Sequence, residues 1–250
     1  MPQALNLDLI EVELLRIRAA TEGWVARSFN KPVSFAITRR LLRTAVTPNQ
    51  ITAFNLLIAL LAAFCVAWGE YPVRILGALL IQFHSILDGC DGEVARLKGS
   101  ASKFGAWFDT LTDDFSNNLF FAALFVGLWH TAQAGWILGL GVIVLGESVA
   151  LSAIIIHYLV TVADTGRAQD FRLAWERKGA VVEEQGPPTV YTRFAKPLLK
   201  RDFFLLMMAI AIVLDLRLPF LLLASIGVTC GFVIYALSFA LAAKQQAFRG

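Results

Sequence analysis

Six long apolar runs set the class of fold that this chain can adopt. They cover residues 51–68, 73–87, 104–129, 135–162, 203–214 and 218–243. Each approaches the ~20 residues with which a helix crosses a bilayer, and the second and fifth need extra length from flanking turns. The composition agrees, because 57% of the residues are hydrophobic and 16% are charged, against about 45–50% and about 25% in a soluble domain. We therefore expect an all-α, polytopic membrane protein with six transmembrane helices.

The basic residues predict how these helices are oriented. If both termini are cytoplasmic, the outer loops contain only Arg74 and Arg217, and every other Lys and Arg lies on the inner side. This asymmetry follows the positive-inside rule. The net charge is only +3, but the basic residues are concentrated on one face, so we expect membrane lipids rather than nucleic acid as partners.

Two amphipathic helices are expected before the first apolar run, at 7–29 and 33–44. In the second, Phe35 accompanies Arg39 and Arg40, a pattern suited to a helix that lies in the membrane interface. The alternative is a helix that packs on the cytoplasmic loops.

The chain divides into three parts on this basis. An interfacial N-terminal region covers 1–45, a six-helix domain covers 46–243, and a short cytoplasmic tail covers 244–250. The six-helix domain contains one sizeable cytoplasmic loop, 163–200, and the sequence shows no internal repeat.

Five aspartates lie in the stretch LDGCDGEVARLKGSASKFGAWFDTLTDD, which joins the second apolar run to the third. Asp88 and Asp91 are three residues apart, and Asp109 and Asp113 are four apart, so each pair shares one face of its helix. The connecting loop is short, so the two helices should be antiparallel neighbours and the four carboxylates should converge near the cytoplasmic surface. Asp114 is turned about 100° away by helix geometry and is left out of the site.

Four converging carboxylates need cations among them, because each unbalanced charge costs several kcal/mol when it leaves water. Oxygen ligands favour hard divalent ions, so we expect two bound ions, Mg²⁺ or Mn²⁺. Two such ions would balance the four negative charges. Paired metal ions are a recurring device for displacement at phosphorus.

Small and basic residues beside the acids fit a ligand that carries phosphate. Gly92, Ala95 and Gly105 leave room for it, and Arg96 offers a planar cation to its phosphates. Taken singly, small residues also allow close helix packing and Arg96 can mark the membrane border. Their combination at these spacings favours a binding site.

Written as spacing, the stretch reads D-x2-D-G-x2-A-R-x8-G-x3-D-x3-D, and it resembles the signature of the CDP-alcohol phosphotransferases at every fixed position. The resemblance implies that Asp88, Asp91 and Asp109 hold the metal pair and that Asp113 completes the site as general base. It implies that the three small residues border the nucleotide and that Arg96 helps to hold its phosphates. The family architecture, six helices after an interfacial amphipathic helix, would cover roughly 31–243 and suggests a homodimer.

The same resemblance implies the reaction. A substituted phosphoryl group would pass from a CDP-alcohol to an acceptor hydroxyl, with release of CMP. Most of the family makes phospholipids, so we expect CDP-diacylglycerol as the donor. The segments NKPVS…TRRLLRTAVTPNQIT and GEVARLKGSASKFGAWFDT further resemble the membrane domain of di-myo-inositol phosphate phosphate synthases, which use CDP-inositol and inositol phosphate. That is the alternative pair of substrates.

A basic cluster before the fifth apolar run is the candidate site for a phosphorylated acceptor. It consists of Arg193, Lys196, Lys200 and Arg201. Lys200 and Arg201 lie nearest the start of the predicted helix, whose dipole favours an anion. The simpler interpretation is that the cluster only enforces topology.

An ion-coupled transporter is the remaining alternative, because acids inside membrane helices often mark ion pathways. Glu147 and His157 in the fourth apolar run could form a relay. A transporter would carry its acids towards the midplane and show inverted repeats, whereas here the acids cluster at one edge. We therefore expect Glu147 to make a structural hydrogen bond.

Overall fold

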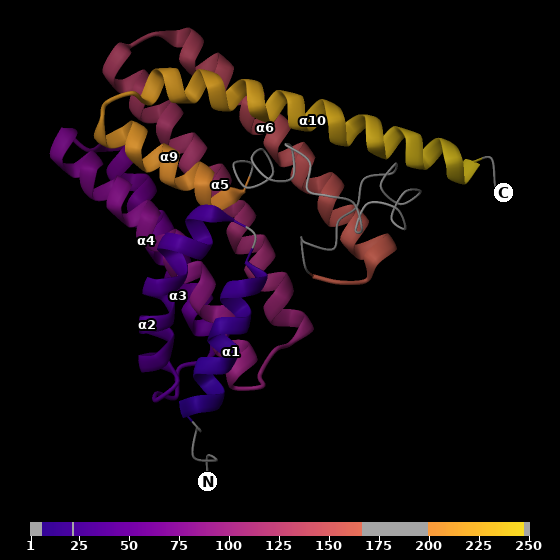
Figure 1. Cartoon of the computed structure of the whole chain (residues 1–250). Helices are drawn as coiled ribbons and strands as arrows, with labels where there is room; N and C mark the ends of the chain where they lie inside the picture. The colour runs from indigo at the N-terminus through magenta and orange to yellow at the C-terminus, as the bar shows by residue number, and fades with distance from the viewer. Residues whose placement is uncertain (1–6, 22, 167–199, 248–250) are drawn as a thin grey trace.

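The computed structural model describes residues 7–21, 23–166 and 200–247, and within these ranges it contains helices and no strands (Figure 1). Arg193 and Lys196 of the predicted basic cluster lie outside them. Two short π-helical turns, η1 and η2, continue into or from longer helices. The elements in chain order are α1 (Leu7–Ala20), η1 (Ala26–Asn30), α2 (Lys31–Leu41), α3 (Pro48–Trp68), α4 (Tyr71–Leu97), α5 (Lys103–Ala132), α6 (Gly135–Tyr158), η2 (Leu159–Ala163), α9 (Arg201–Val213) and α10 (Arg217–Ala247).

Four of the described helices are long and apolar enough to cross a membrane. They are α3, α4, the continuous helix Gly135–Ala163, and Arg217–Leu241 within α10. The third and fifth predicted runs correspond to α5 and α9. The first half of α5 carries several aspartates and asparagines, and α9 has only 13 residues. The chain is therefore an integral membrane protein whose described residues are helical and include four helices that can span a bilayer by themselves.

The helix ends are set by local sequence. Thr47 caps α3 through a capping box with Gln50, and Pro48 occupies the first turn, where its missing N–H is not needed. α4 continues ten residues beyond the predicted run, because the segment up to Leu97 contains several good helix formers. It ends before Gly99, whose φ of 61° is left-handed.

The N-terminal helices break at a different place from the one expected. α1 ends at Ala20, and the chain is helical again from Trp24 through α2. Around Pro32, which cannot donate a backbone hydrogen bond, the chain forms the π-helical turn η1, in which the Lys31 N–H donates to the Ala26 carbonyl. The gap expected between the helices at 7–29 and 33–44 is therefore helical.

α3 is the packing centre for the two helices that carry the acids. Small residues on α3 and two glycines on its partners let the backbones approach closely. A Cβ on Gly127 of α5 would lie 2.6 Å from the Val66 carbonyl, and one on Gly77 of α4 would lie 2.8 Å from a Val66 methyl. α4 and α5 share little backbone contact with each other, so they are not the packed neighbours that the short loop predicted.

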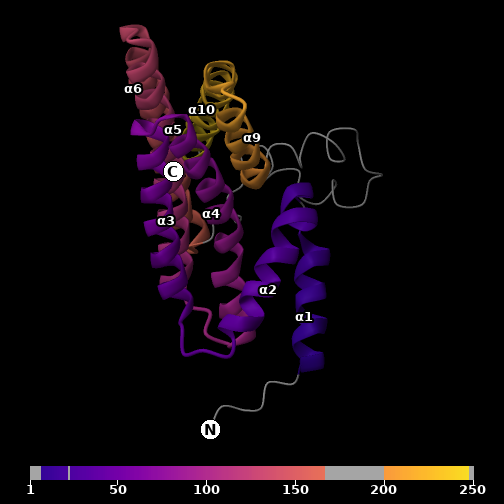
Figure 2. The ribbon, with the colours of Figure 1, turned by 90° about the vertical axis from the view of Figure 1, so that its left-hand side faces the viewer.

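α1 and α2 form a pair beside the C-terminal half of α4 (Figure 2). Their contact is apolar, through residues such as Leu14 and Phe35, and an exposed ion pair joins Arg39 to both carboxylate oxygens of Glu11, at 2.6 and 2.7 Å. The hydrogen bond from Arg39 lowers the pKa of the Glu11 carboxyl.

α6 and α10 pack against each other and leave most of their apolar surface exposed. Thr229 of α10 donates a 2.6 Å hydrogen bond to Glu147 of α6, which confirms a structural hydrogen bond for this acid. His157 instead meets the ring of Phe239 edge-on, at 5.6 Å between centroids. Neither contact links the two residues in a relay.

Candidate active site

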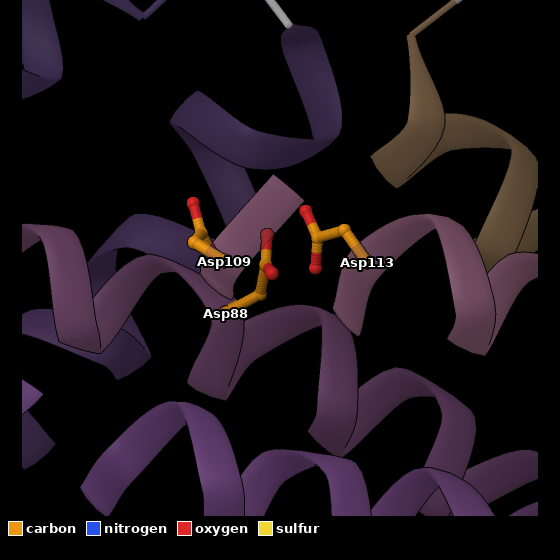
Figure 3. Close-up of side chains that lie close together, drawn as sticks. All are labelled: Asp88, Asp109 and Asp113. Carbon is orange, nitrogen blue, oxygen red and sulfur yellow. The ribbon is translucent and has the colours of Figure 1, made fainter. Parts of the chain in front are cut away.

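Three of the predicted aspartates gather between α4 and α5 (Figure 3). Asp88 projects from α4, and Asp109 and Asp113 project from successive turns of α5, so that one carboxylate oxygen from each lies within 4.8 Å of the other two. All three side chains are half-buried. The helical spacing therefore brings together three of the four acids that it predicted, even though α4 and α5 pack on α3 rather than on each other.

Asp91 lies one turn further along α4 and outside this group of three. It is buried, and the Thr52 hydroxyl of α3 donates to its Oδ2 at 2.5 Å. The Gly92 N–H donates to its Oδ1 at 2.6 Å. Thr52 thus fixes the orientation of an acid that the sequence assigned to the metal site.

Arg201, the first residue of α9, points into the acids. Its Nη1 lies 2.5 Å from Asp113 Oδ2 and 3.0 Å from Asp88 Oδ2. Its Nε donates to Asn117 Oδ1 at 3.0 Å, and its Nη2 lies 3.0 Å from His84 Nε2. The guanidinium therefore bridges two of the acids, whereas the sequence placed Arg201 in a separate basic cluster. Contacts with Asn117 and His84 keep the guanidinium in this position.

The residues predicted for the nucleotide differ in exposure. Gly92 and Arg96 are exposed and Ala95 is half-buried. A Cβ on Gly92 would meet no atom within 4 Å, whereas one on Gly105 would lie 3.1 Å from Asn49 Oδ1. Free space therefore adjoins the acids at Gly92.

Two further predictions can be located. Asp114 accepts a 2.5 Å hydrogen bond from Ser152 of α6, which confirms that it faces away from the other acids. Lys200 occupies the position before the first turn of α9.

Glu93 is a buried acid that the sequence reasoning missed. Its carboxylate accepts hydrogen bonds from three side chains of α2: Lys31 at 2.7 Å, Ser34 at 2.8 Å and Thr38 at 2.7 Å. Gly89, one turn earlier on α4, leaves space for this contact, because a Cβ there would lie 3.1 Å from the Lys31 ammonium. These bonds fix α2 to the part of α4 that carries the catalytic candidates.

The donor set fits a hard divalent cation. The ligand atoms are carboxylate oxygens, which Mg²⁺ and Mn²⁺ prefer. His84 is not free to join them, because its ring contacts Arg201 on one side and the Asn55 carbonyl on the other, at 3.2 Å. One guanidinium balances one of the negative charges, so the cluster retains an excess that favours further cations.

Comparison with known proteins adds to this geometry. A family model described as CDP-alcohol phosphatidyltransferase matches residues 45–242. The chain is 37% identical over 108 residues to the "Bifunctional IPC transferase and DIPP synthase" of Aquifex aeolicus, a match that covers 43% of this chain and 24% of that protein. It is 35% identical over 83 residues to the archaetidylinositol phosphate synthase of Pyrococcus horikoshii, covering 32% of this chain and 42% of the other. The matched part thus spans about a quarter of the first relative and less than half of the second.

A crystal structure of Mycobacterium tuberculosis phosphatidylinositol phosphate synthase (PgsA1) with CDP-DAG bound has the same fold. The TM-score is 0.53 at 19% sequence identity, with 84% of this chain and 91% of the other covered. The family match includes α3 to α9, most of α10 and all four predicted acids. The chain therefore belongs to the CDP-alcohol phosphatidyltransferase family.

Proposed function

We propose that this protein is an integral membrane CDP-alcohol phosphotransferase of phospholipid biosynthesis. It transfers a substituted phosphoryl group from a CDP-alcohol to an acceptor hydroxyl and releases CMP. One observation carries the proposal: Asp88, Asp109 and Asp113, all from the family signature, converge with their carboxylate oxygens within 4.8 Å.

The four acids would hold two divalent cations, Mg²⁺ or Mn²⁺. When bound, these cations would neutralise the charge that develops on the leaving CMP. Asp88, Asp91 and Asp109 serve as ligands, with Thr52 keeping Asp91 in place. Asp113 completes the site and accepts the proton of the incoming hydroxyl.

The cytidine nucleotide lies along the exposed end of α4 in this proposal. Gly92, Ala95 and Gly105 border it, and the free space at Gly92 supports a close approach of the ligand to the backbone. Arg96 is exposed at the last turn of α4, where its planar cation can reach the phosphates of the donor.

CDP-diacylglycerol is the donor that we favour. The support is that a solved structure with the same fold has CDP-DAG bound. The relative named archaetidylinositol phosphate synthase supports a lipid-linked donor more generally. The second candidate is transfer from CDP-inositol to inositol phosphate, which is favoured by the 37% identity to a protein whose name includes DIPP synthase.

The acceptor, if it carries a phosphate, would bind Arg193, Lys200 and Arg201. Of these, Lys200 and Arg201 stand at the start of α9, beside the acids. The helix dipole adds to their attraction for an anion.

We also propose the membrane arrangement. α5 packs on α3 and α9 packs on α4, so both lie alongside helices that can span a bilayer and would complete a set of six. The exposed apolar residues Trp24, Phe29 and Val33 support an interfacial position for α2 and the turns before it. Both termini and the active site are cytoplasmic, and the exposed apolar faces of α6 and α10 are consistent with a homodimer in lipid.

The divisions 1–45, 46–243 and 244–250 follow from this arrangement. The family match over 45–242 supports the middle part.

The direct test is incubation of the purified protein with Mg²⁺, a panel of CDP-alcohols and a panel of acceptors. CMP release and the mass of the product would be measured. Release of CMP together with a phosphodiester product supports a transferase, and the product identifies which donor is used. Absence of CMP with every donor would contradict the proposal.

A pair of neighbouring variants tests the assignment of the base. Asp113→Asn should lower kcat by about 10²–10⁴-fold, the usual contribution of a general base. Asp114→Asn should lose far less, because Asp114 bonds to Ser152 and faces away from the acids. Equal losses at the two positions would show that the helical-face assignment is wrong.

A further inference from the structure

A second cluster of charged residues lies at the other end of the bundle, where α4 begins and where α9 turns into α10. Arg217 Nε donates to Asp215 Oδ1 at 3.1 Å, and Arg74 Nη2 lies 3.8 Å from the same oxygen. The Tyr71 hydroxyl ties the two segments together by donating to the Val213 carbonyl at 2.6 Å. Arg74 precedes Asp88 by fourteen residues of the same helix, so the cluster is about 21 Å from the acids along the helix axis.

The side chains of Arg74 and Arg217 are mostly buried, whereas that of Asp215 is exposed. The side chains of Arg74 and Arg217 are 14% and 4% exposed, whereas that of Asp215 is 57% exposed. The Tyr71 ring covers Arg74, with Cζ 5.8 Å from the ring centroid. Arginines that only mark a membrane border extend their guanidinium groups to water, and these two do not.

Hydrogen bonding leaves both guanidinium groups unsatisfied. Each offers five N–H donors, yet among the described residues the pair makes a single side-chain hydrogen bond, the one from Arg217 to Asp215. Within the part of the chain that the structure describes, Arg74 Nε and Arg217 Nη1 are buried without a hydrogen-bond partner. No other acid in the described part of the chain pairs with either residue, including the nearby Glu70.

The charges of this cluster are also unbalanced. The buried Arg217 and the half-buried Arg74 face one exposed carboxylate, which leaves an excess of one positive charge. A buried charge without a partner costs several kcal/mol, so the cluster is incomplete as it stands. An anion with several acceptor oxygens would supply both the missing charge and the missing acceptors.

We propose that Arg74 and Arg217 form a binding site for a phosphate group. Two planar guanidinium forks are well suited to a tetrahedral oxyanion, which can accept two hydrogen bonds from each. In the topology proposed above the cluster lies at the outer membrane surface, where lipid headgroups present phosphates. Inorganic phosphate has the same chemistry, but it would have to reach the site from water. The site itself follows from the contacts of the two arginines and does not depend on the transferase activity.

The test measures lipid and phosphate binding to the protein in detergent. Native mass spectrometry with added phosphatidylglycerol would count the lipids retained, and calorimetry with inorganic phosphate would test the free ion. Arg74→Gln should weaken retention of one lipid by about tenfold, since it removes hydrogen bonds to a charged group. Arg40→Gln, an exposed arginine of α2, is the control and should not remove that lipid.

Asp215→Asn provides a second variant that should act in the opposite direction. It removes the acid that competes for the arginines, so retention of the lipid should increase. A phosphate ion that binds as tightly as the lipid, and is lost with Arg74→Gln, would assign the site to the free ion. Equal binding of both ligands by the wild type, Arg74→Gln and Asp215→Asn would overturn the proposal. CMP release is unaffected in either case, which separates this site from the proposed function.

Discussion

Removal of the buried charge at Glu93 should loosen the N-terminal helices from the rest of the protein. Glu93→Gln keeps the shape of the side chain but converts an ion into an amide. In the native chain the side chain is 1% exposed, and its carboxylate accepts hydrogen bonds from Lys31, Ser34 and Thr38 at 2.7–2.8 Å. The amide nitrogen cannot accept a hydrogen bond, and the Lys31 ammonium is left without a counter-ion.

The magnitude follows from the burial of both partners. Breaking a buried ion pair by removing one member costs about 3–5 kcal/mol. The Lys31 side chain is 15% exposed and can partly rehydrate, so we take the lower end, about 3 kcal/mol. For a chain of this length that loss corresponds to a decrease in Tm of roughly 6–12 °C.

The assay is thermal unfolding of the protein in one detergent, followed by tryptophan fluorescence, with hydrogen exchange of α2 as a local measurement. The matched control is Glu11→Gln, which breaks the exposed ion pair with Arg39 on the neighbouring helix. Exposed pairs contribute little, so the control should shift Tm far less. Exchange should increase in α2 with Glu93→Gln and stay unchanged in α6.

A double variant separates charge from shape. Lys31→Met combined with Glu93→Gln removes both charges and should recover most of the lost stability, because no buried ion is left unpaired. If the Glu93 and Glu11 variants lower Tm equally, or if the double variant is no more stable than Glu93→Gln alone, the argument from burial is refuted.

Four further predictions concern the active site. Chelation of divalent ions should abolish CMP release and added Mg²⁺ or Mn²⁺ should restore it; undiminished turnover after complete metal removal would contradict the two-ion site. Thr52→Val should lower kcat by about tenfold, the equivalent of one hydrogen bond to a charged group, and Thr52→Ser should retain activity. Arg201→Ala should raise KM for a phosphorylated acceptor by roughly 10-fold, and a change confined to KM for the CDP-alcohol would assign the acceptor pocket elsewhere. Gly92→Val should fold but lose nucleotide binding, whereas Gly127→Ala should unfold, because only the second Cβ meets backbone.

Local periodicity was enough to predict much of the fold and part of the site. The hydrophobic runs mark the position of every helix from α3 to α10 that the structure describes, because a bilayer imposes a fixed length of apolar chain. The steps of three and four residues predicted which aspartates share a helical face. The same reasoning turned Asp114 away from the site, and its bond to Ser152 confirms this.

Contacts between distant segments could not be predicted in this way. The bond from Thr52 to Asp91 joins residues 39 apart, and those from α2 to Glu93 join residues 55–62 apart. In the sequence alone, Glu93 cannot be distinguished from an exposed polar residue, because its hydrogen-bond partners lie far away in the chain. The short loop between α4 and α5 likewise predicted that these two helices pack on each other. Small residues on α3 instead let α3 pack closely against both of them.

Arg201 lies where it can pair either with the carboxylates of the site or with the phosphate of an acceptor. The sequence assigned it to an acceptor phosphate, and the structure places its guanidinium on Asp113 and Asp88. Arg201 can fill these two roles only one after the other, since one guanidinium nitrogen bridges both acids in the structure. Arg201 can turn towards a phosphate only if another cation takes over the balance of charge at the acids, because the carboxylates would otherwise be left unpaired. Asn117 and His84, which hold the other nitrogens, keep the guanidinium close enough to serve either partner. Occupation of the acids by cations and binding of an anionic acceptor should therefore favour each other.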